Sequence, residues 1–237
     1  MSPVKLPLRP CHLRDSDHRY VWEPTREEMA VSVTGVTNWG KDPDRFKGYE
    51  SAAWRGTHVH RAMQALAIDS QIRNDEDNEL SPEFLDEFLA DDGYISPEGI
   101  DCSDWITRLH EMTLWDQVRV LACEFTMCDT RKSLGGQLDL LCEYKGKVLL
   151  VDLKTKSASY RGASKEDLDG YAKQAGGYLQ LLQAGNGAQS PPFVDECRTL
   201  VVTPTETKWL PAMQPDACSL AWEESWGVYA AAALTTF

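Results

Sequence analysis

The clearest pattern in the chain is a pair of apolar-rich runs on either side of Lys145-Gly146. Residues 137–144 and 147–154 have the alternation and composition of strands, and a Gly in the two-residue connection favours a tight hairpin turn. In the register set by this turn, Asp139 faces Asp152. One face is predicted to belong to the core and carries Leu138, Leu140, Cys142, Leu149, Val151 and Leu153.

The remaining pattern predicts helices around this hairpin. Hydrophobic periodicity predicts helices over residues 49–68, 82–89, 103–115, 165–184 and 219–237, and further strands over 118–129 and 198–203. Ser32 or Thr34 is expected to cap a short helix that follows. Residues 1–31 are predicted to be an N-terminal arm. We expect an α/β protein with a single domain over residues 32–237 and an acidic helical insertion at about 67–118.

The facing carboxylates of Asp139 and Asp152 need a compensating charge, because like charges opposite each other destabilise a sheet. They lie either on a solvated edge with Lys154 as counter-ion or around a divalent cation. Mg²⁺ and Mn²⁺ both prefer oxygen ligands. On the same face, Lys154 is placed to reach a water or phosphate beside such an ion. This combination of residues is typical of phosphodiester cleavage.

Four motifs occur in a fixed order along the chain. They are Gly56-Thr57-x-x-His60, Gly136-x-x-Asp139, Asp152-x-Lys154 and Gln174-x-x-x-Tyr178. Together they resemble the RecB-like branch of the PD-(D/E)xK nucleases over roughly residues 32–202. The resemblance implies a restriction-endonuclease-like core, in which a central mixed β-sheet is flanked by helices and the hairpin carries the site.

The resemblance also implies roles for individual residues. The catalytic residues would be Asp139, Asp152, Lys154, Gln174 and Tyr178. Two Mg²⁺ or Mn²⁺ ions would be held by Asp139, Asp152, the Leu153 carbonyl and His60, with Glu124 as an outer ligand. Each of three residues also has a plainer interpretation: His60 as a packed core histidine, Glu124 as a partly exposed strand residue, and Tyr178 as a helix–sheet packing residue. His58 lies roughly 200° around the helix from His60 and is the weaker candidate.

The expected function is a metal-dependent DNA exonuclease that leaves 5′-phosphates. Two alternatives remain: a site- or structure-specific endonuclease, and a nucleic-acid-binding module without chemistry. DNA is the expected partner. No membrane association is expected, because no apolar run approaches the roughly 18 residues that span a bilayer. A recombination or replication protein is a further possible partner, but the sequence does not identify one.

Charge and cysteine content refine these expectations. The net charge is −13, and residues 67–118 alone hold 2 Lys/Arg against 15 Asp/Glu, so the rest of the chain is nearly neutral. A nearly neutral remainder still allows a polyanion to dock locally. The seven cysteines are scattered without a C-x-x-C pair. We therefore expect reduced thiols in the cytoplasm and no iron–sulfur cluster.

Overall fold

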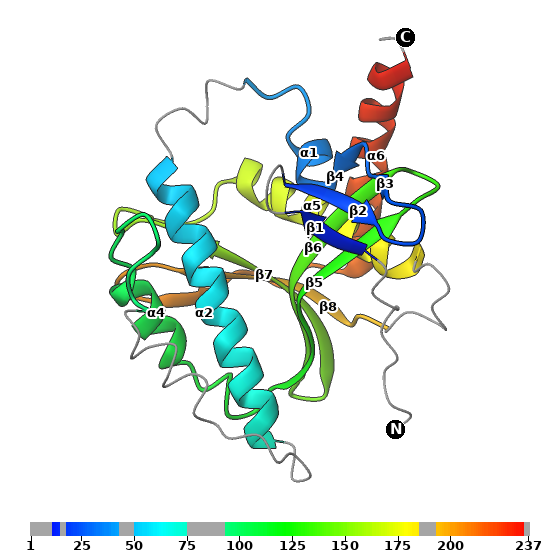
Figure 1. Cartoon of the computed structure of the whole chain (residues 1–237). Helices are drawn as coiled ribbons and strands as arrows, with labels where there is room; N and C mark the ends of the chain where they lie inside the picture. The colour runs from blue at the N-terminus through cyan, green and yellow to red at the C-terminus, as the bar shows by residue number, and fades with distance from the viewer. Residues whose placement is uncertain (1–10, 15–17, 43–49, 75–92, 185–192, 235–237) are drawn as a thin grey trace.

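A computed structural model describes residues 11–14, 18–42, 50–74, 93–184 and 193–234. Its centre is a mixed six-stranded sheet (Figure 1). The strands are β4 (Val31–Ser32), β5 (Arg119–Asp129), β6 (Leu134–Tyr144), β7 (Lys147–Thr155), β8 (Glu196–Val202) and β9 (Thr207–Trp209). The pairs β5–β6, β6–β7 and β8–β9 are antiparallel, whereas β4–β6 and β7–β8 are parallel. The predicted α/β class with a mixed sheet is confirmed.

Helices cover both faces of the sheet. On one face lie α2 (Glu50–Asn74) and α4 (Ser103–His110), and on the other lie α1 (Val33–Thr37), α5 (Lys165–Ala184) and α6 (Pro215–Leu234). Figure 1 shows α2 running diagonally across the front of the sheet, with α5 behind the sheet. In the described part of the chain, no helix has both the length and the apolarity to cross a membrane.

Several predicted bounds are confirmed and others shift. The α5 helix has the predicted bounds, and Ser32 caps α1 by accepting a hydrogen bond from the backbone N–H of Gly35 at 2.9 Å. The helix predicted over 103–115 ends at His110, and Trp115 lies in the turn that follows, where its indole N–H donates to the Leu109 carbonyl at 2.7 Å. The helix predicted over 82–89 lies outside the described residues.

The hairpin has the predicted register. Leu140 pairs with Val151 and Tyr144 with Lys147, and both turn residues, Lys145 and Gly146, have positive φ (51° and 75°). Positive φ at both central positions is the geometry of a type I′ turn. The ladder stops at Leu140, one residue short of Asp139. The two strands therefore separate where the predicted Asp139–Asp152 pair would begin.

The alternation of β6 breaks at the same point, which corrects one prediction. Leu138 packs with α1, α5 and α6, not with the cluster under α2 and α4 that contains Leu140 and Cys142. Asp139 and Leu140 therefore both turn toward α2. Opposite Asp139 lies Glu124, whose φ of 46° is left-handed. A left-handed residue locally reverses the side-chain direction that regular pleating would give.

The N-terminal segment forms a second sheet that the sequence did not predict. Its strands are β1 (Cys11–Arg14), β2 (Arg19–Trp22) and β3 (Glu27–Glu28), all antiparallel. A disulfide joins Cys11 to Cys128 at the end of β5. The expectation of reduced thiols is wrong for this pair; the five free cysteines are Cys102, Cys123, Cys142, Cys197 and Cys218. The pairing across 117 positions is not visible in local sequence.

Candidate metal centre

Three side chains from three elements converge on one point. His60 of α2, Glu124 of β5 and Asp139 of β6 each offer a ligand atom, and these atoms all lie within 4.8 Å of one another. The His60 Nδ1 atom is 3.2 Å from Glu124 Oε1 and 3.6 Å from Asp139 Oδ1. Two carboxylates and an imidazole at this spacing form a ligand set that suits Mn²⁺, and Mg²⁺ through its oxygens.

The electrostatics of this group favour a bound cation. Burial lowers the pKa of His60, but the charges of Asp139 and Glu124 outweigh it and raise the pKa to about 9. In the metal-free protein the imidazole therefore holds a proton between the two carboxylates. A divalent cation in the same place would be held by both carboxylates and would displace that proton from the imidazole.

The backbone of Glu124 has an unusual conformation at this site. Its positive φ is rare for a residue other than glycine and costs of order 1–3 kcal/mol. The Gln137 side-chain amide donates a hydrogen bond to Glu124 Oε2, while Glu124 Oε1 faces His60. Backbone strain of this kind concentrates at functional sites. The sequence predicted that Glu124 lies on the strand, but it did not reveal that the φ angle of Glu124 is positive.

The second half of the predicted site lies around Lys154. Its ammonium donates to Asp152 Oδ1 at 2.8 Å and to Gln174 Oε1 at 3.0 Å. The Gln174 amide in turn donates to the hydroxyl of Tyr178 at 2.8 Å. The four residues form one continuous polar chain from β7 to α5. The predicted i, i+4 pair of Gln174 and Tyr178 is thus in contact with the predicted catalytic lysine.

Asp139 links the two halves. Its Oδ2 atom accepts a hydrogen bond from the backbone N–H of Leu153 at 2.6 Å, just where β6 and β7 separate. Asp152 does not belong to the three-residue group around His60. Burial raises the pKa of Asp152 to about 6, with Asp139 adding to the effect and Lys154 opposing it. Its Oδ2 atom is buried without a hydrogen-bond partner.

Burying a carboxylate oxygen without a hydrogen-bond donor costs free energy unless a cation binds it or the group is protonated. The residues present therefore fit a divalent ion by their chemistry: buried carboxylates, one imidazole and an orphaned carboxylate oxygen. His60, Glu124 and Asp139 are grouped by the fold. Asp152 is next to Leu153 in the chain, and the Leu153 N–H donates a hydrogen bond to Asp139. Asp152 also accepts a hydrogen bond from Lys154.

Two glycines ahead of Asp139 explain how neighbouring elements approach the site. A Cβ atom on Gly136 would lie 2.7 Å from Leu181 Cδ1 and 3.4 Å from the Tyr178 ring, so a larger residue would require the Leu181 side chain to move. A Cβ on Gly135 would lie 2.3 Å from Tyr20. The N-terminal sheet packs against Gly135, and α5 packs against Gly136.

The three-residue group opens into a large pocket of about 950 Å³. Its walls come from α2, the central sheet and the N-terminal sheet, with Gly56, Thr57, Arg61 and Gln64 on the α2 side. Sequence analysis missed the wall contributed by Tyr20, Glu23 and their neighbours. Cys11, His12 and His18 also line this pocket, where Cys11 is in the disulfide and His12 Nδ1 contacts Glu23 Oε1 at 3.2 Å.

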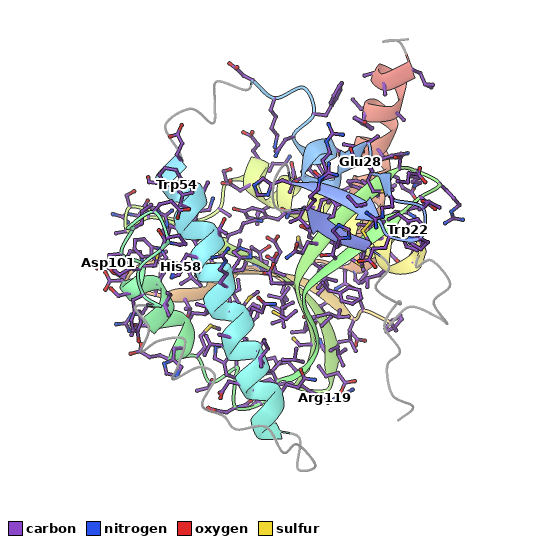
Figure 2. All side chains as sticks on the ribbon, in the orientation of Figure 1. Trp22, Glu28, Trp54, His58, Asp101 and Arg119 are labelled. Atoms are coloured by element: carbon purple, nitrogen blue, oxygen red, sulfur yellow. A yellow bond between two sulfur atoms is a disulfide. The ribbon has the colours of Figure 1, made fainter. Side chains whose placement is uncertain are left out.

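His58 does not reach this pocket. It is buried, and its Nε2 atom lies 2.7 Å from the carbonyl oxygen of Gly93. Figure 2 shows His58 on the side of α2 that faces the segment before α4, where Asp101 lies. The two histidines of α2 therefore have different surroundings, and that His58 is the weaker ligand candidate stays a prediction.

Comparisons with known proteins agree with the motifs. A family model described as the PD-(D/E)XK nuclease superfamily matches residues 36–212. No curated protein matches the chain. Among solved structures, the chain is similar to a "putative exonuclease" from Eubacterium rectale, at 15% identity and a TM-score of 0.48, over 82% of this chain and 76% of that chain. It is also similar to SSO0001, at 12% identity and a TM-score of 0.32, over 77% and 88%. Because the family model covers more than half of its residues, this protein belongs to the PD-(D/E)XK nuclease superfamily.

Proposed function

We propose that this nuclease is a Mg²⁺- or Mn²⁺-dependent DNA exonuclease of the RecB-like branch that leaves 5′-phosphates. The observation that carries the proposal is the convergence of His60, Glu124 and Asp139 next to the Asp152–Lys154 pair. The RecB-like branch itself rests on the Gly-Thr-x-x-His and Gln-x-x-x-Tyr motifs. The family supplies a nucleic-acid substrate, and DNA as that substrate is part of the proposal.

In the proposed mechanism His60, Glu124 and Asp139 would hold one cation, and Asp139, Asp152 and the Leu153 carbonyl would hold a second. Such ions lower the pKa of bound water and neutralise charge that develops on a phosphate. The protein's own contribution is to fix its ligands: Leu153 N–H orients Asp139, Gln137 orients Glu124, and Lys154 orients Asp152.

Lys154 is expected to act as a hydrogen-bond donor and not as a base. Burial lowers the pKa of Lys154, but Asp152 and Asp139 outweigh burial, so the net shift is upward. The group therefore stays an ammonium and donates hydrogen bonds to water or a phosphate oxygen. It does not accept the proton of the attacking water in this state. Gln174 of α5 accepts a hydrogen bond from the ammonium, and the Tyr178 hydroxyl accepts one from the Gln174 amide.

Two further points belong to the proposal. We treat residues 32–237 as one nuclease domain, with the N-terminal sheet packed against β5 and β6. A cytoplasmic location stays a prediction, and the Cys11–Cys128 disulfide argues against it, because disulfides are rare in a reducing compartment.

The test is a digest of end-labelled linear DNA beside a covalently closed circle, in Mn²⁺, with the Asp139→Asn variant as control. An exonuclease degrades only the linear form, and an endonuclease cuts both. A protein that leaves both intact in Mn²⁺ and Mg²⁺ is a binding module, and the proposed function is then wrong. The control separates the activity of this protein from a contaminating nuclease.

A further inference from the structure

The N-terminal sheet forms a wall of the pocket that contains the metal group. Six residues of the pocket lining come from this sheet and its two turns: Cys11, His12, Leu13, His18, Tyr20 and Glu23. Figure 1 shows β1 and β2 crossing over β5 and β6, and the Cys11–Cys128 disulfide fixes one end of this sheet to β5. The family match begins at residue 36, so this wall lies outside the segment that defines the superfamily.

Within this wall, Tyr20 lies against the strand that carries Asp139. A Cβ atom on Gly135 would lie 2.3 Å from both Cβ and Cγ of Tyr20. The phenol ring therefore occupies the space over Gly135 that any other residue would fill. Since Gly135 lies four positions before Asp139 on β6, the ring is fixed to the strand that supplies a metal ligand.

Tyr20 lies close enough to the candidate metal ligands for the charges of Glu124 and Asp139 to act on its phenol. Tyr20 lines the same cavity as Glu124, Gln137 and Asp139. Burial raises the pKa of Tyr20 to about 12, and the charges of Glu124 and Asp139 add to the shift. The phenol keeps its proton over the whole range of working pH. It is therefore a neutral hydrogen-bond donor in a pocket whose lining also includes Arg61 and the carboxylates of Glu23, Glu124 and Asp139.

A bound phosphate needs donors on more than one side. Lys154 supplies them from the α5 side of the sheet, where it contacts Asp152 and Gln174. Tyr20 is the corresponding donor from the N-terminal sheet. Hydrogen bonds from a neutral donor to a charged oxygen are among the stronger ones in proteins.

We propose that Tyr20 is a substrate-binding residue whose hydroxyl donates a hydrogen bond to a phosphate oxygen of the nucleic-acid strand bound over the metal group. This inference rests on the proposed nuclease function. The N-terminal sheet is then part of the substrate site, and it gives this chain a contact that the superfamily segment alone does not contain.

The test compares Tyr20→Phe with wild type, using Tyr144→Phe as the matched control. Tyr144 lies half-buried at the far end of β6, outside the pocket, so its hydroxyl is not expected to touch substrate. Tyr20→Phe keeps the ring over Gly135 and removes only the donor. Two quantities are measured: the Kd for a labelled DNA oligonucleotide in Ca²⁺, and kcat and KM in Mn²⁺.

We expect Tyr20→Phe to weaken DNA binding or kcat/KM roughly 10- to 100-fold, the usual range for losing a hydrogen bond to a charged group. The melting temperature and the Mn²⁺ requirement should stay at the wild-type values. Tyr144→Phe should match wild type in every measurement.

Binding and kcat/KM within two-fold of wild type for Tyr20→Phe would overturn the proposal while leaving the nuclease function in place. A changed Mn²⁺ requirement with unchanged DNA affinity would also overturn it, since Tyr20 would then act on the metal group. A wild-type protein that neither binds nor cuts DNA removes the proposed function and the substrate assigned to Tyr20 together.

Discussion

Asp139 is a residue whose charge is unfavourable until a cation is bound. Burial raises the pKa of Asp139 even though His60 and Lys154 oppose it, so the ionised form is disfavoured in the metal-free fold. A raised carboxyl pKa means that this destabilising contribution is absent below the ordinary pKa near 4 and grows as the pH rises above it. The proposed ligand function would compensate for this cost.

The first prediction follows from this sign. Asp139→Asn should abolish cleavage, because one ligand common to both cations is lost. Without metal, its melting temperature at pH 7 should equal or exceed that of wild type, and the two should converge near pH 4. Thermal melts in EDTA across this pH range, beside a cleavage assay, provide the measurement. A variant that melts clearly below wild type at pH 7 would indicate a structural Asp139.

The second prediction contrasts the two histidines of α2. His60→Ala should reduce activity by orders of magnitude and raise the Mn²⁺ concentration that the remaining activity needs. His58→Ala removes a buried hydrogen bond to Gly93 and should lower stability by about 1–3 kcal/mol. Its Mn²⁺ requirement should stay unchanged. Mn²⁺ titrations and melting temperatures for both variants decide between a ligand and a packed core histidine at position 60.

Single residues of the site could be predicted only where a motif marks them. Asp139, Asp152 and Lys154 are close in sequence, so hairpin register alone brought them near each other. Tyr20 and Glu124 could not be found in this way. Tyr20 comes from a sheet more than a hundred positions away from β6, and the left-handed backbone of Glu124 has no signal in residue type.

At the scale of elements, the contact between α5 and α6 is set by the glycines in α5. A Cβ on Gly176 would lie 2.1 Å from the backbone carbonyl oxygen of Cys218. A Cβ on Gly177 would lie 2.6 Å from Val33 and 2.9 Å from the Trp222 ring. A backbone oxygen cannot move aside as a flexible side chain can. The helices reach this distance only because the first glycine has no side chain.

The third prediction uses this difference within one helix. Gly176→Ala should destabilise the protein by about 1–3 kcal/mol or more, since α5 and α6 must separate. Gly170→Ala, on the same helix with open space around it, should stabilise by about 0.5–1 kcal/mol. Chemical denaturation of both variants tests the pair. Equal effects at the two positions would show that helix packing does not depend on Gly176.

The accuracy of the element predictions depended on how local their causes are. The hairpin and α5 were predicted well because a turn glycine and a helical periodicity are local signals. The helix at α4 ends earlier than its pattern suggested, since Trp115 is buried in the following turn instead of extending the helix. The N-terminal sheet escaped prediction because its strands are short and are held by contacts with β5 and β6.

At the scale of the whole molecule, the acidic surplus and the candidate metal ligands lie in different segments of the chain. The acidic surplus lies in residues 67–118, of which 75–92 are outside the described part of the chain. The pocket brings together one imidazole and two carboxylates from three separate elements. This combination is built by the fold, and no single segment contains it.

The fourth prediction is that Mn²⁺ supports cleavage at least as well as Mg²⁺, because an imidazole ligand suits Mn²⁺ better. Ca²⁺ should permit DNA binding without turnover, since its larger and more flexible coordination holds water less precisely. Cleavage rates with each ion, and DNA binding in Ca²⁺, provide the test. Undiminished cleavage in excess EDTA would exclude the proposed mechanism.

The family and the α/β fold could be predicted from motifs and periodicity because the superfamily core is carried by one hairpin and the helix after it. What surrounds that core could not be predicted. The strand separation at Asp139 and the extra wall of the pocket arise from contacts between distant segments, which alternation and helical periodicity do not encode.

The Cys11–Cys128 bond also makes a covalent ring of the chain between these residues. The α2 helix with His60 lies inside this ring, whereas the hairpin with Asp139, Asp152 and Lys154 lies beyond it. One backbone cut anywhere between residues 11 and 128 would therefore leave both halves of the site in a single covalent molecule. A protease-nicked sample should run as one band on a non-reducing gel and as two bands after reduction.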